Sequence, residues 1–266
     1  MLESDPMKIL LTNDDGIGAP GLATLLDAVS GLGEVIVVAP QSVQSGASHA
    51  MTDRTPLKVV PYDLSGARSA HAVEGKPADC TRLGLCHYAT SSEWVISGIN
   101  AGGNLGVDAY YSGTVGAARE AAILGHPAIA LSQYIRDAAS LNWERSGRWA
   151  AEVIGQIMTR GTQPGLFWNV NLPHPQDDAH TPAIVVAPLA AEPHLVRYRQ
   201  GEDVGSTSVF HYRGRYQDRP RPRGSDVDVV FGGDICVTPM LLDVSACDLS
   251  GGPFKSPAPC PATHST

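Results

Sequence analysis

The chain has 266 residues, of which 43% are hydrophobic, and its formal net charge at pH 7 is −8. This composition suits one large domain or two, and the acidic balance argues against nonspecific binding to a nucleic-acid duplex. No segment approaches the roughly 20 apolar residues that span a bilayer, and residues 1–6 lack a signal-peptide core. We therefore expect a cytoplasmic protein that binds neither a membrane nor a nucleic-acid duplex.

The chain begins with alternating strand and helix patterns. Residues 8–13 form an apolar run typical of a buried strand, and apolar residues recur at helical spacing over 22–29. Residues 34–40 are rich in β-branched side chains and end in a proline, which predicts a second buried strand. This order indicates a parallel sheet covered by helices.

The alternation continues through the middle of the chain. The expected elements are a strand at 94–97, a helix at 114–124, a strand at 128–132, a helix at 146–158 and a strand at 167–172. Because Pro173 stops the last strand, we expect the main sheet to end near it.

The pattern weakens over residues 188–226, where aromatic residues alternate with arginines. Residues 209–216 favour an extended arm or hairpin, and a final strand is expected at 234–238.

The predicted organisation is one α/β domain over residues 7–240. Its core covers about 7–187, and the arm and closing strand cover about 188–240. The tail at 241–266, which is rich in proline, serine and glycine towards its end, is expected to be partly disordered.

Two adjacent carboxylates, Asp14 and Asp15, stand where the first strand ends. Successive side chains of a strand point to opposite faces, so both acids converge on one point only where the strand unwinds, as Gly16 permits. Two neighbouring carboxylates repel each other unless a cation lies between them. This arrangement suggests a site for a divalent metal.

Two other interpretations of this segment are weaker. Residues 16–21 match the GxGxxG dinucleotide fingerprint, but a pyrophosphate would face both acids, and residues 38–41 lack the expected ribose-binding acid. A phosphorylated receiver domain would need a third aspartate after a later strand. Asp53 lies in a polar stretch instead.

Oxygen donors and glycines follow the expected strands. They lie in residues 41–49 after the second strand and in residues 98–106 after the third. Because ligands of a parallel sheet bind outside the carboxyl ends of its strands, we expect these segments to gather around Asp14 and Asp15. Two aspartates, a serine and an asparagine would form a partial shell for Mg²⁺ or Mn²⁺.

Ser112, Gly113 and Thr114 lead directly into an expected helix. Backbone N–H groups at a helix N-terminus bind anions, so these residues are the predicted phosphate-binding site. A metal beside them would permit hydrolysis of a phosphomonoester by an activated water. Taken singly, each motif also fits a plain turn or helix cap, and their position at successive strand ends favours the functional interpretation.

Long ordered strings of the sequence resemble the stationary-phase survival protein SurE family of metal-dependent nucleotidases, over about residues 7–240. The matching segments are 9–17 (ILLTNDDGI), 38–40 (VAP) with 45–46 (SG), 75–80 (GKPADC), 97–106 (SGINAGGNLG), 111–115 (YSGTV) and 169–173 (NVNLP).

The resemblance implies a three-layer α/β sandwich with a Rossmann-like, mostly parallel sheet. A C-terminal extended β-hairpin arm would be exchanged between the subunits of a homodimer or homotetramer. The implied activity is hydrolysis of nucleoside 5′- and 3′-monophosphates, the reaction of a 5′-nucleotidase, with polyphosphate shortening as a possible side activity.

The resemblance also implies roles for particular residues. One divalent cation per subunit would be bound by Asp14, Asp15, Ser45 and Asn100. Asn104 would face the phosphate together with residues 112–114, so the expected catalytic set is Asp14, Asp15 and Asn104.

The sequence departs from the family pattern at two positions near these motifs. Gln44 precedes Ser45 where relatives often have arginine, and Lys76 replaces the usual threonine before Pro77. Substrate preference is therefore expected to differ while the metal ligands persist.

Three questions stay open at the level of sequence. The proton donor to the leaving oxygen is either His49 or a metal-bound water. The arginines within 188–226 either grip longer anionic substrates or, as we favour, solvate a loop and pair across a subunit interface. A noncatalytic sensor that binds a phosphorylated ligand in the same pocket is the alternative to an enzyme.

Overall fold

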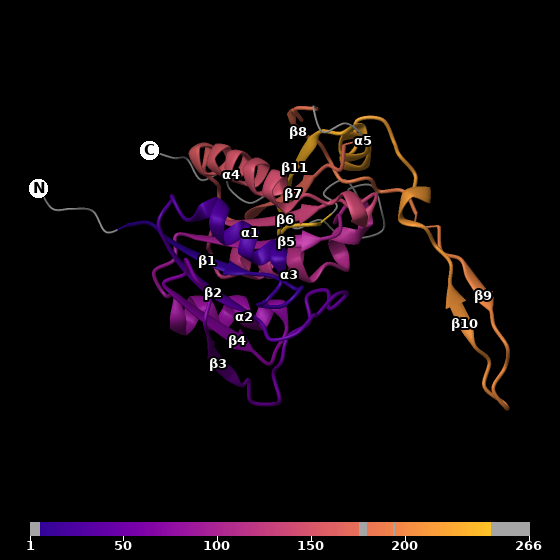
Figure 1. Cartoon of the computed structure of the whole chain (residues 1–266), viewed down its shortest axis with the longest axis horizontal. Helices are drawn as coiled ribbons and strands as arrows, with labels where there is room; N and C mark the ends of the chain where they lie inside the picture. The colour runs from indigo at the N-terminus through magenta and orange to yellow at the C-terminus, as the bar shows by residue number, and fades with distance from the viewer. Residues whose placement is uncertain (1–5, 176–179, 194, 246–266) are drawn as a thin grey trace, which may run out of the picture.

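The computed structural model describes residues 6–175, 180–193 and 195–245. Its main strands are β1 (Lys8–Thr12), β2 (Glu34–Pro40), β3 (Val59–Tyr62), β4 (Ser69–Val73), β5 (Trp94–Ala101), β6 (Ala128–Gln133), β7 (Leu166–Leu172), β8 (Ile184–Val186) and β11 (Ile235–Leu241). Within the described residues they form one nine-stranded sheet in the order β3-β4-β2-β1-β5-β6-β7-β11-β8 (Figure 1). The strands from β4 to β7 are parallel, whereas β3 and β11 run antiparallel to their neighbours β4 and β7.

Helices cover both faces of this sheet (Figure 1). They are α1 (Pro20–Val29), α2 (Pro77–Leu83), α3 (Gly113–Ile123), α4 (Trp143–Arg160) and α5 (Asp226–Gly232). Short helical turns lie at Gly84–Tyr88, Gly106–Tyr110, Ala138–Ser140 and Tyr216–Asp218. Buried residues of α1 and α4 belong to one core cluster and those of α2 and α3 to another, on opposite faces of the sheet. The molecule is therefore a three-layer α/β sandwich, as expected.

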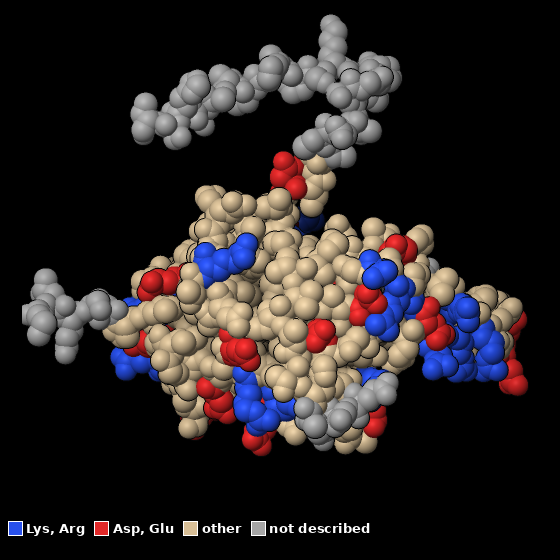
Figure 2. All heavy atoms as spheres, turned by 90° about the horizontal axis from the view of Figure 1, so that it is seen from above, with Lys and Arg blue, Asp and Glu red and all other residues tan. Residues whose placement is uncertain are grey.

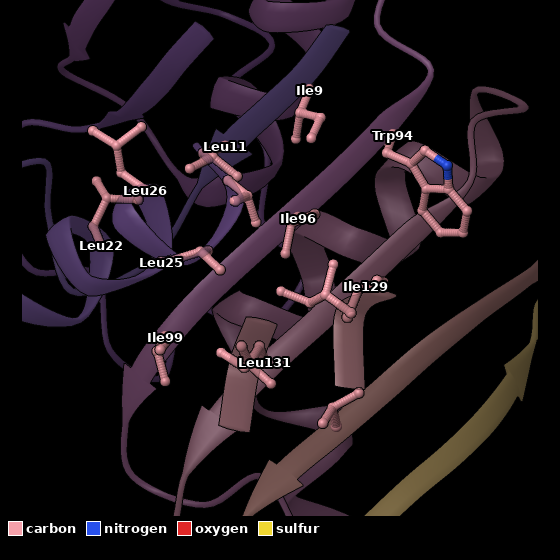
Figure 3. Close-up of a cluster of buried hydrophobic side chains, with 14 of the residues drawn as sticks. Ile9, Leu11, Leu22, Leu25, Leu26, Trp94, Ile96, Ile99, Ile129 and Leu131 are labelled. Carbon is pink, nitrogen blue, oxygen red and sulfur yellow. The ribbon is translucent and has the colours of Figure 1, made fainter. Parts of the chain in front are cut away.

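The core forms because the central strands are apolar on both faces, which is typical of a covered parallel sheet. In β1, Ile9 and Leu11 pack towards α1, whereas Leu10 belongs to the cluster on the opposite face. Figure 3 shows the first cluster, where side chains of α1 meet those of β1, β5 and β6. This packing holds β1 inside the sheet and so determines where the residues that follow it lie.

Two expectations about the sheet are wrong. The sheet does not end near Pro173, because β11 pairs with β7 and β8 pairs with β11 beyond it. The third expected strand also does not stop at Ser97. It continues as β5 to Ala101 past a register shift between Ser97 and Asn100, where Gly98 has a φ of +146° that other residues rarely adopt.

The expected arm is an antiparallel hairpin of β9 (Tyr198–Gln200) and β10 (Phe210–Tyr212) that projects from the body (Figure 1). At its base the Arg213 N–H donates to the carbonyl of Arg197 at 2.8 Å. Basic side chains gather where the arm leaves the body, at the right of Figure 2.

The described part of the chain contains no helix that is both long and apolar enough to cross a bilayer. From residue 246 onward, the expected tail lies outside the described residues. The domain boundaries at 7–240 stay a prediction.

Candidate metal centre and phosphate site

The turn after β1 is fixed by bonds to its neighbours. Gly16 has a φ of +96°, a conformation that glycine adopts without strain, and its carbonyl accepts a hydrogen bond from Asn13 Nδ2 at 2.8 Å. The Ile17 N–H donates to the carbonyl of Pro40 at the end of β2, also at 2.8 Å. Asp14 and Asp15 therefore lie on a rigid turn between β1 and α1.

Asp14 is buried, with only 4% of its surface exposed, and it contacts the start of α3. Its Oδ1 accepts from the Thr114 hydroxyl at 2.6 Å and its Oδ2 from the Thr114 N–H at 3.1 Å. Burial raises the pKa of this carboxyl from 3.8 to about 6; the hydroxyl of Thr114 opposes the rise and the charge of Asp15 adds to it. A cation bound here would favour the ionised form that burial disfavours.

Asp15 lies beside the end of β5. Its Oδ2 accepts from the Ala101 N–H at 2.8 Å, next to Asn100 in the chain. The Asn100 side chain donates its Nδ2 to the carbonyl of Gly102 at 2.7 Å, and its amide oxygen is the atom with the chemistry to bind a hard cation. The structure thus brings the predicted ligands Asp15 and Asn100 to the same edge of the sheet.

The loop after β2 also docks on this turn. The Gln44 N–H donates to the backbone carbonyl of Asp14 at 2.7 Å, and the next residue, Ser45, is exposed. The four predicted metal ligands therefore come from three segments. The turn that carries Asp14 and Asp15 is bonded to the residue before Ser45 and to the residue after Asn100.

The predicted phosphate site lies at the N-terminus of α3, where Ser112 is the N-cap. Two N–H groups at this helix end have partners within the protein, since Val115 N donates to Ser112 Oγ at 3.0 Å and Thr114 N donates to Asp14 Oδ2 at 3.1 Å. Gly113 packs so closely on Asp14 that an added Cβ would lie 2.9 Å from the Asp14 Cβ and Oδ2. The phosphate site and the first predicted ligand are therefore one contiguous structure.

Asn104 is held by a hydroxyl of β6 and by two side-chain amides of β7. Its N–H donates to Asn171 Oδ1 and its Nδ2 to Ser132 Oγ, both at 2.7 Å. Its carbonyl accepts from Asn169 Nδ2 at 3.0 Å and from Asn171 Nδ2 at 3.2 Å. The NVNLP segment therefore orients the loop that carries Asn104.

Sequence reasoning missed two buried acids that hold the loop carrying Ser45. Asp79 accepts from the Thr52 N–H and hydroxyl, each at 2.8 Å, and is 2% exposed. Glu120 is 1% exposed and accepts from His49 Nε2 at 2.7 Å while also pairing with Arg82. A recognisable signal existed for Asp79, since an acid at the third position of a helix that begins with proline is typical of a capping arrangement.

Arginines at the base of the arm form internal pairs. Arg219 pairs with Asp108 at 2.7 Å, stacks 3.6 Å from the ring centre of Tyr216 and has a side chain only 9% exposed. Arg221 pairs with Asp228 at 2.7 Å. For these two arginines the structure favours a structural role over a role in substrate binding.

Within the described ranges, no group of three or more His, Cys, Asp or Glu residues is placed to hold a metal ion. A cation at this site would rely on two carboxylates together with hydroxyl and amide oxygens. That donor set suits Mg²⁺ or Mn²⁺ better than zinc or copper.

The fold and the site together are those of α/β proteins that bind small ligands at the carboxyl ends of a parallel sheet. The model of the family described as "Survival protein SurE" matches residues 9–192, more than half of the chain. The chain therefore belongs to the SurE family.

Individual relatives support this assignment. A putative 5′-nucleotidase of Synechocystis is 44% identical over 237 residues, covering 89% of this chain and all of the relative. The 5′-nucleotidase SurE of Paramagnetospirillum magneticum is 37% identical over 260 residues, covering 92% of this chain and 94% of the relative. The crystal structure of the SurE protein from Aquifex aeolicus superposes with a TM-score of 0.77 at 31% identity, covering 90% of this chain and 94% of that one.

Proposed function

We propose that this chain is a divalent-metal-dependent phosphomonoesterase that hydrolyses nucleoside 5′- and 3′-monophosphates to nucleoside and phosphate. Its enzyme class, 5′-nucleotidase, is the one named for its family relatives. The observation that carries the proposal is the contact between Asp14 and Thr114 at the N-terminus of α3, because it places a carboxylate suited to a cation directly beside the predicted phosphate site.

The residues present fit a hard divalent cation. Asp14 and Asp15, with the oxygens of Ser45 and Asn100, would hold it. Because burial raises the pKa of the Asp14 carboxyl to about 6, a positive charge bound beside it would favour the ionised form. When bound, the cation supplies Lewis-acid polarisation of the phosphoryl group and activation of an attacking water.

The protein's own groups orient the reaction. Thr114 holds Asp14 through two hydrogen bonds, and Ser112 caps the helix whose dipole favours the phosphate. Asn104 is fixed by its neighbours and is our choice for a further phosphate contact. His49, held by Glu120, or a bound water would donate the proton to the leaving oxygen.

Further parts of the proposal concern the whole protein. We propose a homodimer or homotetramer assembled through exchange of the β9–β10 arm, a cytoplasmic location and shortening of polyphosphate as a side activity. The exposed aromatic residues of the arm support the assembly, since an isolated hairpin is marginally stable in water.

The test is phosphate release from 5′-AMP and 3′-AMP with Mg²⁺ or Mn²⁺, before and after chelation. We expect turnover of both substrates that chelation abolishes and added metal restores. Nucleotide binding without turnover under either cation would instead identify the noncatalytic phospho-ligand sensor.

A further inference from the structure

Lys76 and Gln44 meet at the rim of the site although they come from different elements. Lys76 precedes α2, and Gln44 lies in the loop after β2. The Lys76 Nζ donates to Gln44 Oε1 at 2.8 Å, and both residues are half-buried. Near the family motifs, Gln44 and Lys76 are the two residues that the resemblance marks as departures, and the structure brings them into contact.

This contact adjoins both halves of the site. Gln44 binds the backbone of Asp14 through its own N–H at 2.7 Å. Pro77, the next residue after Lys76, packs on Gly113, where an added Cβ would lie 3.1 Å from Pro77 Cγ. The lysine therefore reaches Gln44 from the side of the predicted phosphate site.

Among the residues that the structure describes, the ammonium of Lys76 makes no ion pair. Within the described part of the chain, no carboxylate oxygen lies within 4.0 Å of its Nζ, and the nearby Asp79 accepts its backbone N–H instead. Lys58 and Arg82, by contrast, pair with Glu74 and Glu120. A half-buried ammonium bonded only to a neutral amide favours an anionic ligand.

We propose that Lys76, oriented by Gln44, binds the phosphate dianion of the substrate and favours monoesters over singly charged diesters. This inference rests on the proposed function and deepens it. The two negative charges of Asp14 and Asp15 neutralise the charge of a divalent cation. A bound phosphate dianion therefore requires a further positive group nearby, and Lys76 supplies it. Gln44 fixes the ammonium without neutralising it, because its side chain carries no charge.

The experiment compares Lys76→Met, Lys76→Arg and Lys58→Met with the wild type. Lys58→Met is the matched control, since it removes the same charge from a side chain that is 78% exposed. Calorimetry on the Mn²⁺-loaded protein measures binding of inorganic phosphate, and steady-state kinetics with 5′-AMP and bis(p-nitrophenyl) phosphate measure KM and kcat.

In Lys76→Met we expect phosphate affinity to fall about 10- to 100-fold, which is the value of a charge-assisted hydrogen bond. KM for 5′-AMP should rise by a similar factor while kcat falls less, and the preference for the monoester should shrink. Lys76→Arg should recover most of the affinity, and Lys58→Met should match the wild type.

Unchanged phosphate binding in Lys76→Met, or an equal loss in Lys58→Met, overturns the inference. The inference is also overturned if Lys76→Met loses as much affinity for adenosine as it loses for phosphate. Adenosine carries no phosphate, so its weaker binding would show that the pocket has collapsed. If the wild type lacks turnover but its phosphate binding depends on Lys76, the proposed function fails and the inference holds.

Discussion

At the scale of single residues, the site depends on a carboxyl that is buried before any cation arrives. Asp14 is both desolvated and close to Asp15, and the two Thr114 bonds offset only part of that cost. A positive charge bound at this site would offset the desolvation of Asp14 and its repulsion from Asp15, and would therefore be stabilising. The rigid turn favours metal binding because it holds the two carboxylates in place before the metal binds.

The raised pKa of Asp14 predicts a pH dependence of stability. The Asp14 carboxyl loses its proton at about pH 6 in the folded metal-free protein and near pH 3.8 in the unfolded chain. The folded state therefore binds this proton more tightly than the unfolded state does. The free energy of unfolding should therefore fall by about 2 to 3 kcal/mol as pH rises from 4 to 7. Urea denaturation of chelator-treated wild type and Asp14→Asn across this range isolates the contribution of Asp14 as their difference.

In Asp14→Asn we expect metal binding and turnover to be lost while the metal-free fold gains stability at pH 7, because the substitution removes a buried charge. Calorimetric titration with Mn²⁺ and the 5′-AMP assay measure these effects. Wild-type metal affinity in the variant would remove Asp14 from its assigned role, and an identical pH slope in the two proteins would contradict the burial argument.

Gly113→Ala should impair catalysis without unfolding the protein. Its Cβ would press on the Asp14 carboxylate and on Pro77, and a displacement of about 1 Å at a catalytic group can cost about 10²-fold in rate. Gly155→Ala in α4 is the control, since nothing lies within 4 Å of its added Cβ. It should raise stability by about 0.5–1 kcal/mol. Equal activity in the two variants would show that the close packing on Asp14 is unimportant.

At the scale of elements, the loop between β2 and β3 is positioned by helices on one face of the sheet. His49 bonds to Glu120 in α3, and Thr52 bonds to Asp79 in α2. Since Ser45 belongs to this loop, the two buried acids set the position of one predicted metal ligand. Packing between α2 and α3 is therefore linked to the geometry of the site.

Glu120→Gln should lower the free energy of unfolding by about 1–3 kcal/mol, because it breaks a buried ionic contact whose partner Arg82 is half exposed and can recover water. Metal affinity should fall as well, since the loop loosens. Glu74→Gln disrupts an exposed pair with Lys58 and should cost less than about 0.5 kcal/mol. Denaturant titration and Mn²⁺ calorimetry test both variants, and comparable losses would contradict the anchoring role of Glu120.

At the scale of the whole molecule, the β9–β10 arm carries exposed aromatic residues that the body does not cover. Tyr198, Phe210 and Tyr212 are 64%, 60% and 56% exposed. Large apolar side chains gathered on a projecting hairpin are typical of a surface that packs on another chain. The arm base, in contrast, is bound to the body, since Tyr216 donates its hydroxyl to the carbonyl of Gly103 near Asn104.

If the arm is exchanged as proposed, replacing residues 198–212 with a short Gly-Ser linker should convert the proposed oligomer to a monomer. The chain ends left by the deletion lie at the bonded pair Arg197 and Arg213, so the linker closes without strain. Light scattering measures the mass, and thermal unfolding shows whether the body persists. A variant with the mass of the wild-type oligomer would contradict arm exchange, as would a wild type that is already monomeric.

Much of the core could be predicted because its elements carry strong local patterns. The β-branched run of β2 and the helical spacing of α1 appear at their expected positions. The short α2 and the edge strands β3 and β8 were missed. Seven residues are too few to show a helical period, and the exposed β3 contains a proline that weakens a strand pattern.

The family, the α/β class and the residues at the ends of the first strands can be predicted from the amino-acid sequence, since these follow from short-range patterns and ordered strings. Which donors meet which acceptors depends on how the chain packs in three dimensions. Thr114 reaches Asp14 across 100 positions, and Lys76 reaches Gln44 across 32. These contacts depend on the order of strands in the sheet and on the docking of helices over it, and a local pattern contains neither.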